Sequence, residues 1–170
     1  MKTKLFLLSI VLAWLAVMAG CGDTKAPSGG ALTVNPSTLS DNDGVLPYDD
    51  AYIYTTVTGP NGIPMNGINV TYEGLYAYGQ TSGNVGVYAF LNSKGQICPT
   101  PCTNKTDERG ISVMKVRLCT TVACNQYVPL PSSLAGLSAT SPVAYKTNIY
   151  VSSGSLTPAS VAVQVNQSLQ

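Results

Sequence analysis

Two runs of alternating apolar and polar residues, joined by a segment rich in glycine, proline and asparagine, constrain the fold of this chain most. Residues 51–57 and residues 68–72 both alternate, and a period of two is typical of a half-buried β-strand. The segment between them contains three Gly, two Pro and two Asn. Gly and Asn accept positive φ and Pro cannot donate to a strand ladder, so the chain must turn here. The sequence therefore predicts two strands joined by a turn, which indicates an all-β domain.

The same alternation recurs along the rest of the chain, whereas helical periodicity does not. Further strands are predicted at residues 32–36, 85–91, 111–118, 145–152 and 159–166. In the third of these runs, Met114, Val116 and Leu118 face one way and Lys115 and Arg117 the other. No long window has apolar residues at the spacing of an amphipathic helix, so we expect no major helix.

Seven to eight short strands are the number found in an immunoglobulin-like β-sandwich. We therefore predict a single domain of this kind over residues 32–166, with loop insertions and with residues 167–170 as a C-terminal tail. We interpret residues 37–50 as a loop, because their Asp and Asn side chains favour Asx turns. Residues 125–144 are interpreted as an ordered insertion, because a bare loop of about 20 residues is unusual in a compact domain.

The N-terminus is typical of a signal peptide. The uncharged residues 5–20 follow a short basic lead and are fewer than the roughly 20 that a spanning helix needs. The segment from Val17 to Cys21 resembles a bacterial lipobox, with Met18 where Leu is commoner. The resemblance implies that a signal peptide, residues 1–20, is removed and that Cys21 is acylated. Two or more acyl chains anchor a protein firmly, so the membrane is an expected partner. An ordinary signal peptide that contains Cys is the alternative.

Residues 21–31 are small, polar and rich in Gly, Pro and Ser, which predicts a lipid-anchored flexible tether. Gly22 follows Cys21, and Asp23 lies one place later than the Asp that tends to retain lipoproteins in the inner membrane of enteric bacteria. This favours an outer-membrane location, with the domain facing the periplasm or the cell surface.

Two segments resemble the signature of bacterial immunoglobulin-like domains of the invasin and intimin type. Residues 57–72 (Val-Thr-Gly-Pro-Asn-Gly-Ile-Pro-Met-Asn-Gly-Ile-Asn-Val-Thr-Tyr) are similar to the family pattern D-x-N-G-x-P-x-x-G-x-x-V-x-F. Residues 106–116 (Thr-Asp-Glu-Arg-Gly-Ile-Ser-Val-Met-Lys-Val) are similar to T-D-x-x-G-x-x-x-V-x-L. The resemblance implies an immunoglobulin-like fold and a role as a rigid, surface-exposed spacer. The family's domains normally occur in tandem arrays, whereas this one is alone, which favours an accessory subunit.

Four cysteines follow Cys21 as two close pairs, Cys98 with Cys102 and Cys119 with Cys124. An even number in an exported chain predicts that all four are in disulfide bonds. A structural zinc site is the alternative, although the spacings are wider than the CxxC of most such sites. Three pairings are possible. If residues 111–118 form one strand, its two ends are about 25 Å apart, at about 3.3 Å per residue, and Cys119 lies at the far end. This distance favours the two local pairs.

Tyr72, Tyr76, Tyr78 and Tyr88 lie within 17 residues and are candidate contacts for a partner or a glycan. Tyrosine combines an apolar ring with a polar tip, so a cluster suits stacking on a sugar or a protein interface. The alternative, which we favour, is that these rings are half-buried on a sheet face. An exposed concave patch would indicate a binding protein, whereas flat or buried rings would indicate a structural module.

Asp41, Asp43, Asp49 and Asp50 are weak candidates for calcium binding, because clustered carboxylate oxygens suit Ca²⁺. The segment lacks the ligand order and distal Glu of an EF-hand, and Asx turns account for the same residues. We therefore expect no metal and no other cofactor.

The residue inventory argues against an enzyme. There is no His, which excludes Ser-His-Asp and Cys-His catalysis, and no two acids are singled out as a glycosidase pair. Without the two lysines of the signal peptide, seven Lys and Arg face eight Asp and Glu, so nothing suggests nucleic-acid binding. We predict a lipid-anchored, non-enzymatic cell-envelope module, a structural, adhesin-like or accessory subunit that binds another envelope or surface protein. The alternative is a small-ligand or glycan-binding lipoprotein that uses residues 72–88.

Overall fold

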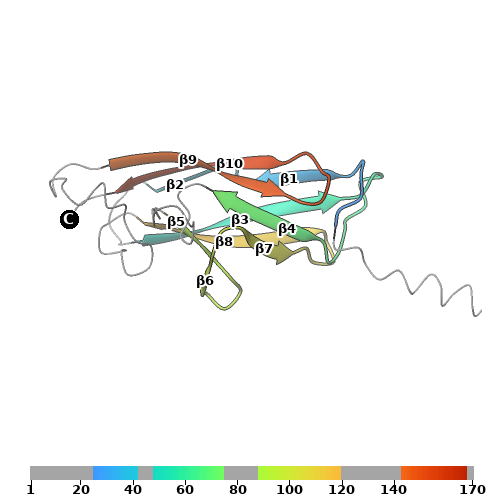
Figure 1. The fold of residues 1–170 in the computed structure, drawn as a ribbon, viewed down its shortest axis with the longest axis horizontal. Coiled ribbons are helices and arrows are strands. Elements are labelled where there is room, and N and C mark those ends of the chain that lie inside the picture. Colours follow the sequence, from blue (N-terminus) through green and yellow to red (C-terminus); the bar gives the residue numbers. More distant parts are fainter. Residues whose placement is uncertain (1–24, 42–47, 75–87, 120–142, 168–170) are drawn as a thin grey trace, which may run out of the picture.

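The computed structural model describes residues 25–41, 48–74, 88–119 and 143–167. Within these ranges the chain forms ten strands and no helix, arranged as two five-stranded sheets that face each other (Figure 1). Sheet A has the order β1 (Ala31–Asn35), β3 (Tyr48–Thr58), β8 (Ile111–Cys119), β5 (Tyr88–Leu91) and β6 (Ile97–Cys98). Sheet B has the order β2 (Thr38–Asp41), β10 (Ala159–Gln167), β9 (Val143–Ser152), β4 (Asn69–Gly74) and β7 (Cys102–Lys105). The predicted all-β sandwich of two sheets is confirmed.

Each predicted strand is present, but the described residues contain three more strands than the seven predicted runs. These are β2, β6 and β7, which are all short. The interpretation of residues 37–50 as a loop was wrong for β2 and for the first residues of β3. β2 pairs in parallel with β10, and its Leu39 is buried in the core. A four-residue strand with one apolar side chain gives too short a pattern to detect from alternation.

The turn segment between β3 and β4 crosses from sheet A to sheet B, so the two strands do not form a hairpin. Gly62 adopts a φ of +73°, which favours glycine, and the Gly59 N–H donates to the Ile63 carbonyl at 2.8 Å. The Met65 N–H donates to the Val57 carbonyl at 3.1 Å. The predicted turn is therefore present, and it closes one end of the core between the sheets.

The two segments that carry the family-like signature lie against each other at this end of the sandwich. The Thr106 side-chain oxygen accepts from the Ile68 N–H at 2.9 Å and donates to the Met65 carbonyl. The Gly110 carbonyl accepts from the Val57 N–H at 2.8 Å. Gly110 has a φ of +74°, and a Cβ there would lie 2.6 Å from the Val57 carbonyl oxygen. The signature residues therefore have a structural role, since they join the ends of two sheets.

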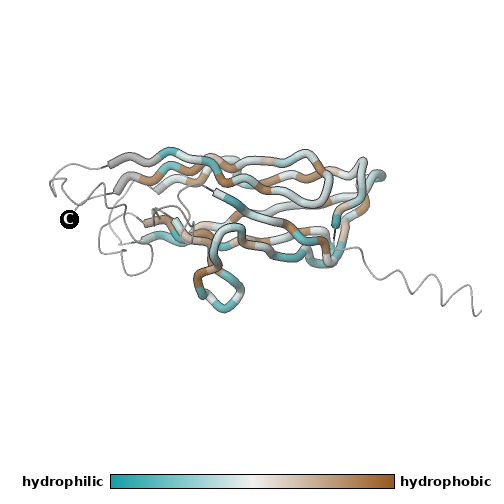
Figure 2. The backbone as a smooth tube through the Cα atoms, in the orientation of Figure 1, coloured by the Kyte–Doolittle hydropathy of each residue, from teal (hydrophilic) through white to brown (hydrophobic). Residues whose placement is uncertain are grey.

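The core lies between the sheets, on the sides of the strands that the alternation predicts. Hydrophobic and hydrophilic residues alternate along the strands (Figure 2). In β8, Met114, Val116 and Leu118 are buried, as predicted. The largest fully buried side chains come from both sheets: Tyr72, Tyr88, Phe90, Ile53, Met114, Leu118, Ile149, Val57, Val70 and Val116. Burial of this many large side chains gives the fold its stability.

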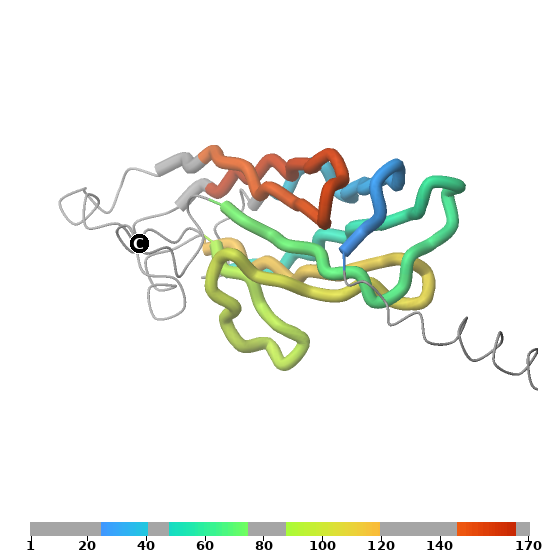
Figure 3. Tube along the Cα trace, turned by 45° about the vertical axis from the view of Figure 1, so that its right-hand side comes forward, coloured from blue at the N-terminus to red at the C-terminus, as the bar shows by residue number. Residues whose placement is uncertain are grey.

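The described domain begins before the first strand. Ala26 is 5% exposed and belongs to the core cluster. It lies against Gly154 in the β9–β10 turn, where a Cβ would be 2.8 Å from the Ala26 carbonyl oxygen. The first described residues thus lie beside the last turn of the chain (Figure 3). Residues 26–31, which the sequence assigned to the flexible tether, are part of the folded domain. None of the described residues belongs to a helix long and apolar enough to cross a membrane.

Candidate functional site

The described tyrosines of the 72–88 cluster lie in the core and not on a surface. Tyr72 and Tyr88 are both 0% exposed, so neither is a contact residue. Their candidate role in partner or glycan contact is therefore contradicted, and both rings are buried more completely than the half-burial favoured from the sequence. The reason is alternation, since Tyr72 faces the same side of β4 as the buried Val70. Tyr76 and Tyr78 lie outside the described residues.

The two buried phenols have different surroundings. The Tyr72 hydroxyl donates to the Thr55 hydroxyl oxygen at 2.9 Å and lies 3.1 Å from that of Ser112. Tyr72 belongs to sheet B and its two partners to sheet A, so this contact ties the sheets together. The Tyr88 hydroxyl has no hydrogen-bond partner among the described residues and fills the space where Gly74 would carry a Cβ. Burial raises the pKa of both phenols, so neither ionises near neutral pH.

Cys98 and Cys102 form the predicted local disulfide, with Cα atoms 5.7 Å apart. Cys98 is in β6 of sheet A and Cys102 is in β7 of sheet B, so this bond joins edge strands of the two sheets although it is local in sequence. Cys119 is also disulfide-bonded. Cys124 lies outside the described residues, and so does the predicted lipidation site, Cys21.

The weak calcium candidates do not form a metal site in the described residues. The Arg117 guanidinium instead donates two hydrogen bonds to the Asp50 carboxylate, at 2.8 and 3.0 Å. The Lys115 ammonium forms a salt bridge with the same carboxylate at 2.7 Å. The Asp50 carboxylate, which calcium would need as a ligand, is therefore already paired with Arg117 and Lys115. One Asp49 oxygen accepts from the Asp50 N–H. Asp43 and the side chain of Asp41 lie outside the described residues. No group of three or more His, Cys, Asp or Glu in the described ranges is placed to hold a metal.

The outer face of sheet A carries a row of tyrosines, which we call the tyrosine stripe: Tyr48, Tyr52 and Tyr54 of β3. Tyr52 and Tyr54 are 44% and 46% exposed. The Arg117 guanidinium carbon lies 4.0 Å from the centre of the Tyr48 ring, and the Lys115 nitrogen lies 5.9 Å from that of Tyr52. Cations at these distances are attracted to the negative face of an aromatic ring. The stripe is thus a rigid surface of rings with cations beside them.

Asp50 holds the two cations in place between the rings. The hydrogen bonds from Arg117 hold the pKa of the Asp50 carboxyl below its usual range. In turn, the hydrogen bond to Asp50 raises the pKa of Lys115. All three groups therefore remain charged across the neutral pH range, and the geometry of this face does not change with physiological pH.

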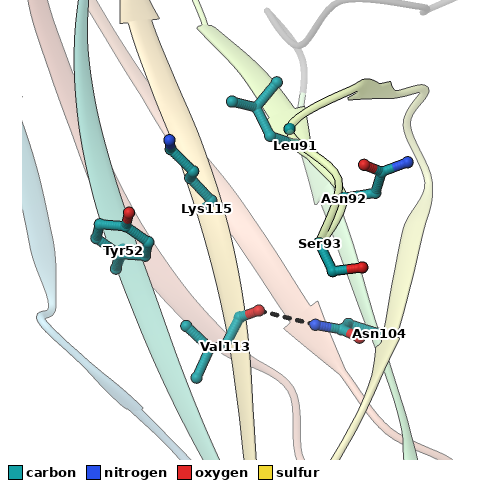
Figure 4. A pocket seen from close by; sticks show the side chains of 8 residues that line it. Tyr52, Leu91, Asn92, Ser93, Asn104, Val113 and Lys115 are labelled. Atoms are coloured by element: carbon teal, nitrogen blue, oxygen red, sulfur yellow. Dashed lines mark hydrogen bonds between the residues drawn. The ribbon is translucent and has the colours of Figure 1, made fainter.

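An open groove with a volume of about 480 Å³ lies beside the stripe on the same face. Its lining residues come from four strands and one turn: Tyr52, Leu91, Asn92, Ser93, Gly95, Asn104, Val113 and Lys115. Tyr52 lies on one side, the turn after β5 lies on the other, and Lys115 and Val113 lie between them (Figure 4). We call this hollow the sheet A groove. A rigid concave surface of this size, part apolar and part polar, suits a small ligand.

The turn that forms one wall of the groove is braced by its own side chain. The Asn92 carboxamide oxygen accepts from the backbone N–H groups of Lys94 and Gln96, at 2.9 and 3.0 Å. The Asn92 N–H and carbonyl also bond to Gln96 and Gly95 through the backbone. Gly95 takes a φ of +74°, which glycine adopts without strain. The wall is therefore formed before any ligand arrives.

Sequence reasoning missed the exposed tyrosines and selected buried ones. The signal was present, because Tyr52 and Tyr54 alternate with Ile53 and so face away from the core. No such signal identifies Asn104 and Ser93, which reach the groove from β7 and from the turn after β5.

Comparison with known proteins relates this chain to others by shape. No protein-family model and no curated protein matches the sequence. Among solved structures, the D00-D0 domain of intimin aligns with a TM-score of 0.39 and 10% identity, over 84% of this chain and 48% of that structure. WR4, a member of the MSP family of C. elegans, aligns with a TM-score of 0.35 and 11% identity, over 80% of this chain and 96% of that one.

The periplasmic chaperone SfaE aligns with a TM-score of 0.35 and 6% identity, over 82% of this chain and 58% of that structure. In the comparison with intimin, this chain spans about half the length of the intimin structure that it matches. The assignment of a two-sheet sandwich rests on the strand pairing of the chain itself.

Proposed function

We propose that this protein is a lipid-anchored, non-enzymatic module of the bacterial outer membrane, related to immunoglobulin-like domains of the invasin and intimin type. The observation that carries the proposed binding role is the tyrosine stripe, because exposed aromatic side chains such as Tyr are enriched among the residues that contribute most to protein interfaces. The stripe and the groove beside it form the face that contacts another envelope component. The absence of His from the chain supports a binding role and not a catalytic one.

The position of Ala26 supports a short connection to the membrane. If Cys21 is the acylated residue, four residues separate it from the buried Ala26. Extended chain spans about 3.3–3.6 Å per residue, so the domain stands within roughly 20 Å of the anchor. The end of the sandwich with the β3–β4 and β9–β10 turns then faces the membrane, because Ala26 lies beside Gly154 there. The tyrosine stripe runs along the side of the sandwich, where an envelope component can reach it.

Mass spectrometry of the mature N-terminus tests the anchor. We expect a chain that begins at Cys21 and carries acyl groups, and an unmodified Cys21 or a cut at another position contradicts the proposal. A Cys21→Ser variant should move the protein from the membrane fraction to the soluble fraction.

Crosslinking in gently solubilised envelopes tests the contact face. We expect the crosslinked products of the wild type to disappear in the Tyr52→Ser/Tyr54→Ser variant. They should persist in Tyr150→Ser, which removes a ring that is 51% exposed on sheet B. Equal loss in both variants, or no loss in either, would remove the stripe from consideration as the contact face.

A further inference from the structure

The sheet A groove exists because β8 is paired only in part on one side. β5 pairs with residues Lys115 to Leu118 of β8 and ends at Leu91, so no described strand of sheet A pairs with Val113 on that side. The Asn104 side chain stands in for the missing strand and donates to the Val113 carbonyl at 2.8 Å. An added peptide strand needs this carbonyl as its partner, and Asn104 already occupies it. The groove therefore does not suit a β-strand from another protein.

The apolar part of the groove is formed mainly by the exposed side chains of Tyr52 and Val113. Tyr52 exposes 44% of its surface and Val113 exposes 39%. They come from neighbouring strands, and Val113 faces the groove between Tyr52 and Asn104 (Figure 4). The face of an aromatic ring is weakly negative and attracts the weakly positive C–H groups of an apolar surface. A pyranose ring presents such C–H groups on one of its faces.

The polar part of the groove consists mainly of hydrogen-bond donors. Asn104 uses one amide N–H for Val113, and Asn92 uses one for the Gln96 side chain at 3.2 Å. Each carboxamide has two N–H groups, so one on each remains for a ligand in the described part of the chain. Ser93 also lines the groove, and Lys115 has N–H groups beyond the one directed at Asp50. A ligand for this wall must carry many acceptor oxygens.

We propose that the sheet A groove is a glycan-binding site, in which one pyranose ring lies against Tyr52 and its oxygens accept from Asn92, Ser93, Asn104 and Lys115. A saccharide combines an apolar C–H face with a rim of oxygens, which matches both parts of the groove. This inference rests on the proposed function, because it names the chemical class of the component that the contact face recognises. The binding residues differ from the 72–88 tyrosines that the sequence suggested, since Tyr72 and Tyr88 are buried.

Titration of the purified full-length protein in detergent with chitotriose, cellotriose and maltotriose tests the proposal. Amide NMR signals of Ser93, Gly95 and Val113 should shift with at least one of these sugars, and calorimetry gives the affinity. Tyr52→Ala should weaken binding about tenfold or more, whereas Tyr52→Phe keeps the ring and should change it less than about threefold. Tyr150→Ala is the matched control and should bind as the wild type does.

Three results would overturn the inference: no shift with any of the three sugars, equal affinity in Tyr52→Ala, or an equal loss in Tyr150→Ala. Circular dichroism of each variant verifies its fold, and Tyr52→Phe keeps the test decisive if Tyr52→Ala is unstable. The titration needs no membrane and no acyl group. If no sugar binds but crosslinking still depends on the tyrosine stripe, glycan binding is refuted and the proposed envelope module is not. If Cys21 is unmodified, the proposed membrane anchor is refuted and the result of the sugar titration is unaffected.

Discussion

Removal of one oxygen from each of two buried tyrosines should have opposite effects on stability. Tyr72→Phe deletes a hydroxyl that lies within hydrogen-bond distance of Thr55 and Ser112, which are neighbours in sheet A and both 0% exposed. Tyr88→Phe deletes a hydroxyl that is equally buried but has no partner in the part of the chain that the structure describes. The two substitutions remove the same group from the same type of side chain, so each serves as the control for the other.

The expected magnitudes follow from the partners that each hydroxyl has. Tyr72→Phe leaves two buried hydroxyls without their shared partner, which should lower the free energy of unfolding by about 1–3 kcal/mol. Tyr88→Phe removes the cost of burying an unpaired hydroxyl and should leave that free energy unchanged or raise it by about 1 kcal/mol. The variants should therefore differ by about 1–4 kcal/mol.

Urea unfolding at pH 7 with the disulfides intact measures this difference. At an m-value of about 2 kcal/mol per M, the unfolding midpoints of the two variants should be roughly 0.5–2 M apart. Ser112→Ala combined with Tyr72→Phe should show less than additive loss, because both remove the same contact. The reasoning is refuted if both phenylalanine variants lose the same stability, or if Tyr88→Phe loses more.

Three further predictions concern other contacts. Asp50→Asn should lower the free energy of unfolding by about 1–3 kcal/mol at pH 7. Its carboxyl has a lowered pKa, so the difference from wild type should be complete above about pH 4 and vanish as the pH falls through that pKa, which a pH series of unfolding curves tests. Replacing both Cys98 and Cys102 by Ser should cost about 2 kcal/mol for so short a loop, and unchanged stability would contradict this. Gly74→Ala should destabilise the wild type strongly and a Tyr88→Phe background less, because the Tyr88 hydroxyl fills the Cβ position; equal losses would be inconsistent with that contact.

The sequence predicts the strands well because alternation reports which residues face the core. In β3, Ile53 and Val57 are buried as their period indicates, and the same holds for Val161, Val163 and Val165 in β10. Alternation does not report which sheet a strand joins, because pairing depends on residues far apart in the chain. The Gly- and Pro-rich segment after β3 was correctly predicted as a turn, but it connects the two sheets, which no local pattern reveals.

A strand that is buried on both of its faces does not show the alternation of apolar and polar residues from which the core-facing side is predicted. All four residues of β5 are buried, from Tyr88 to Leu91. Phe90 faces the core, whereas Ala89 is covered on the outer face by Cys119, Tyr48 and Ile97. The tyrosine at the start of this strand therefore could not be assigned to the core or the surface from its own segment.

The choice between the two sets of tyrosines illustrates what sequence spacing can and cannot give for a binding face. Closeness in sequence made residues 72–88 a cluster, yet Tyr72 is in one sheet and Tyr88 in the other, and both face the core between them. Tyr52 and Tyr54 lie only two residues apart, and their strand's alternation directs both outward. Whether an outward tyrosine belongs to a site depends on the neighbours that register brings beside it. Tyr150 is just as exposed but does not line the sheet A groove, so exposure of a ring alone does not define a site.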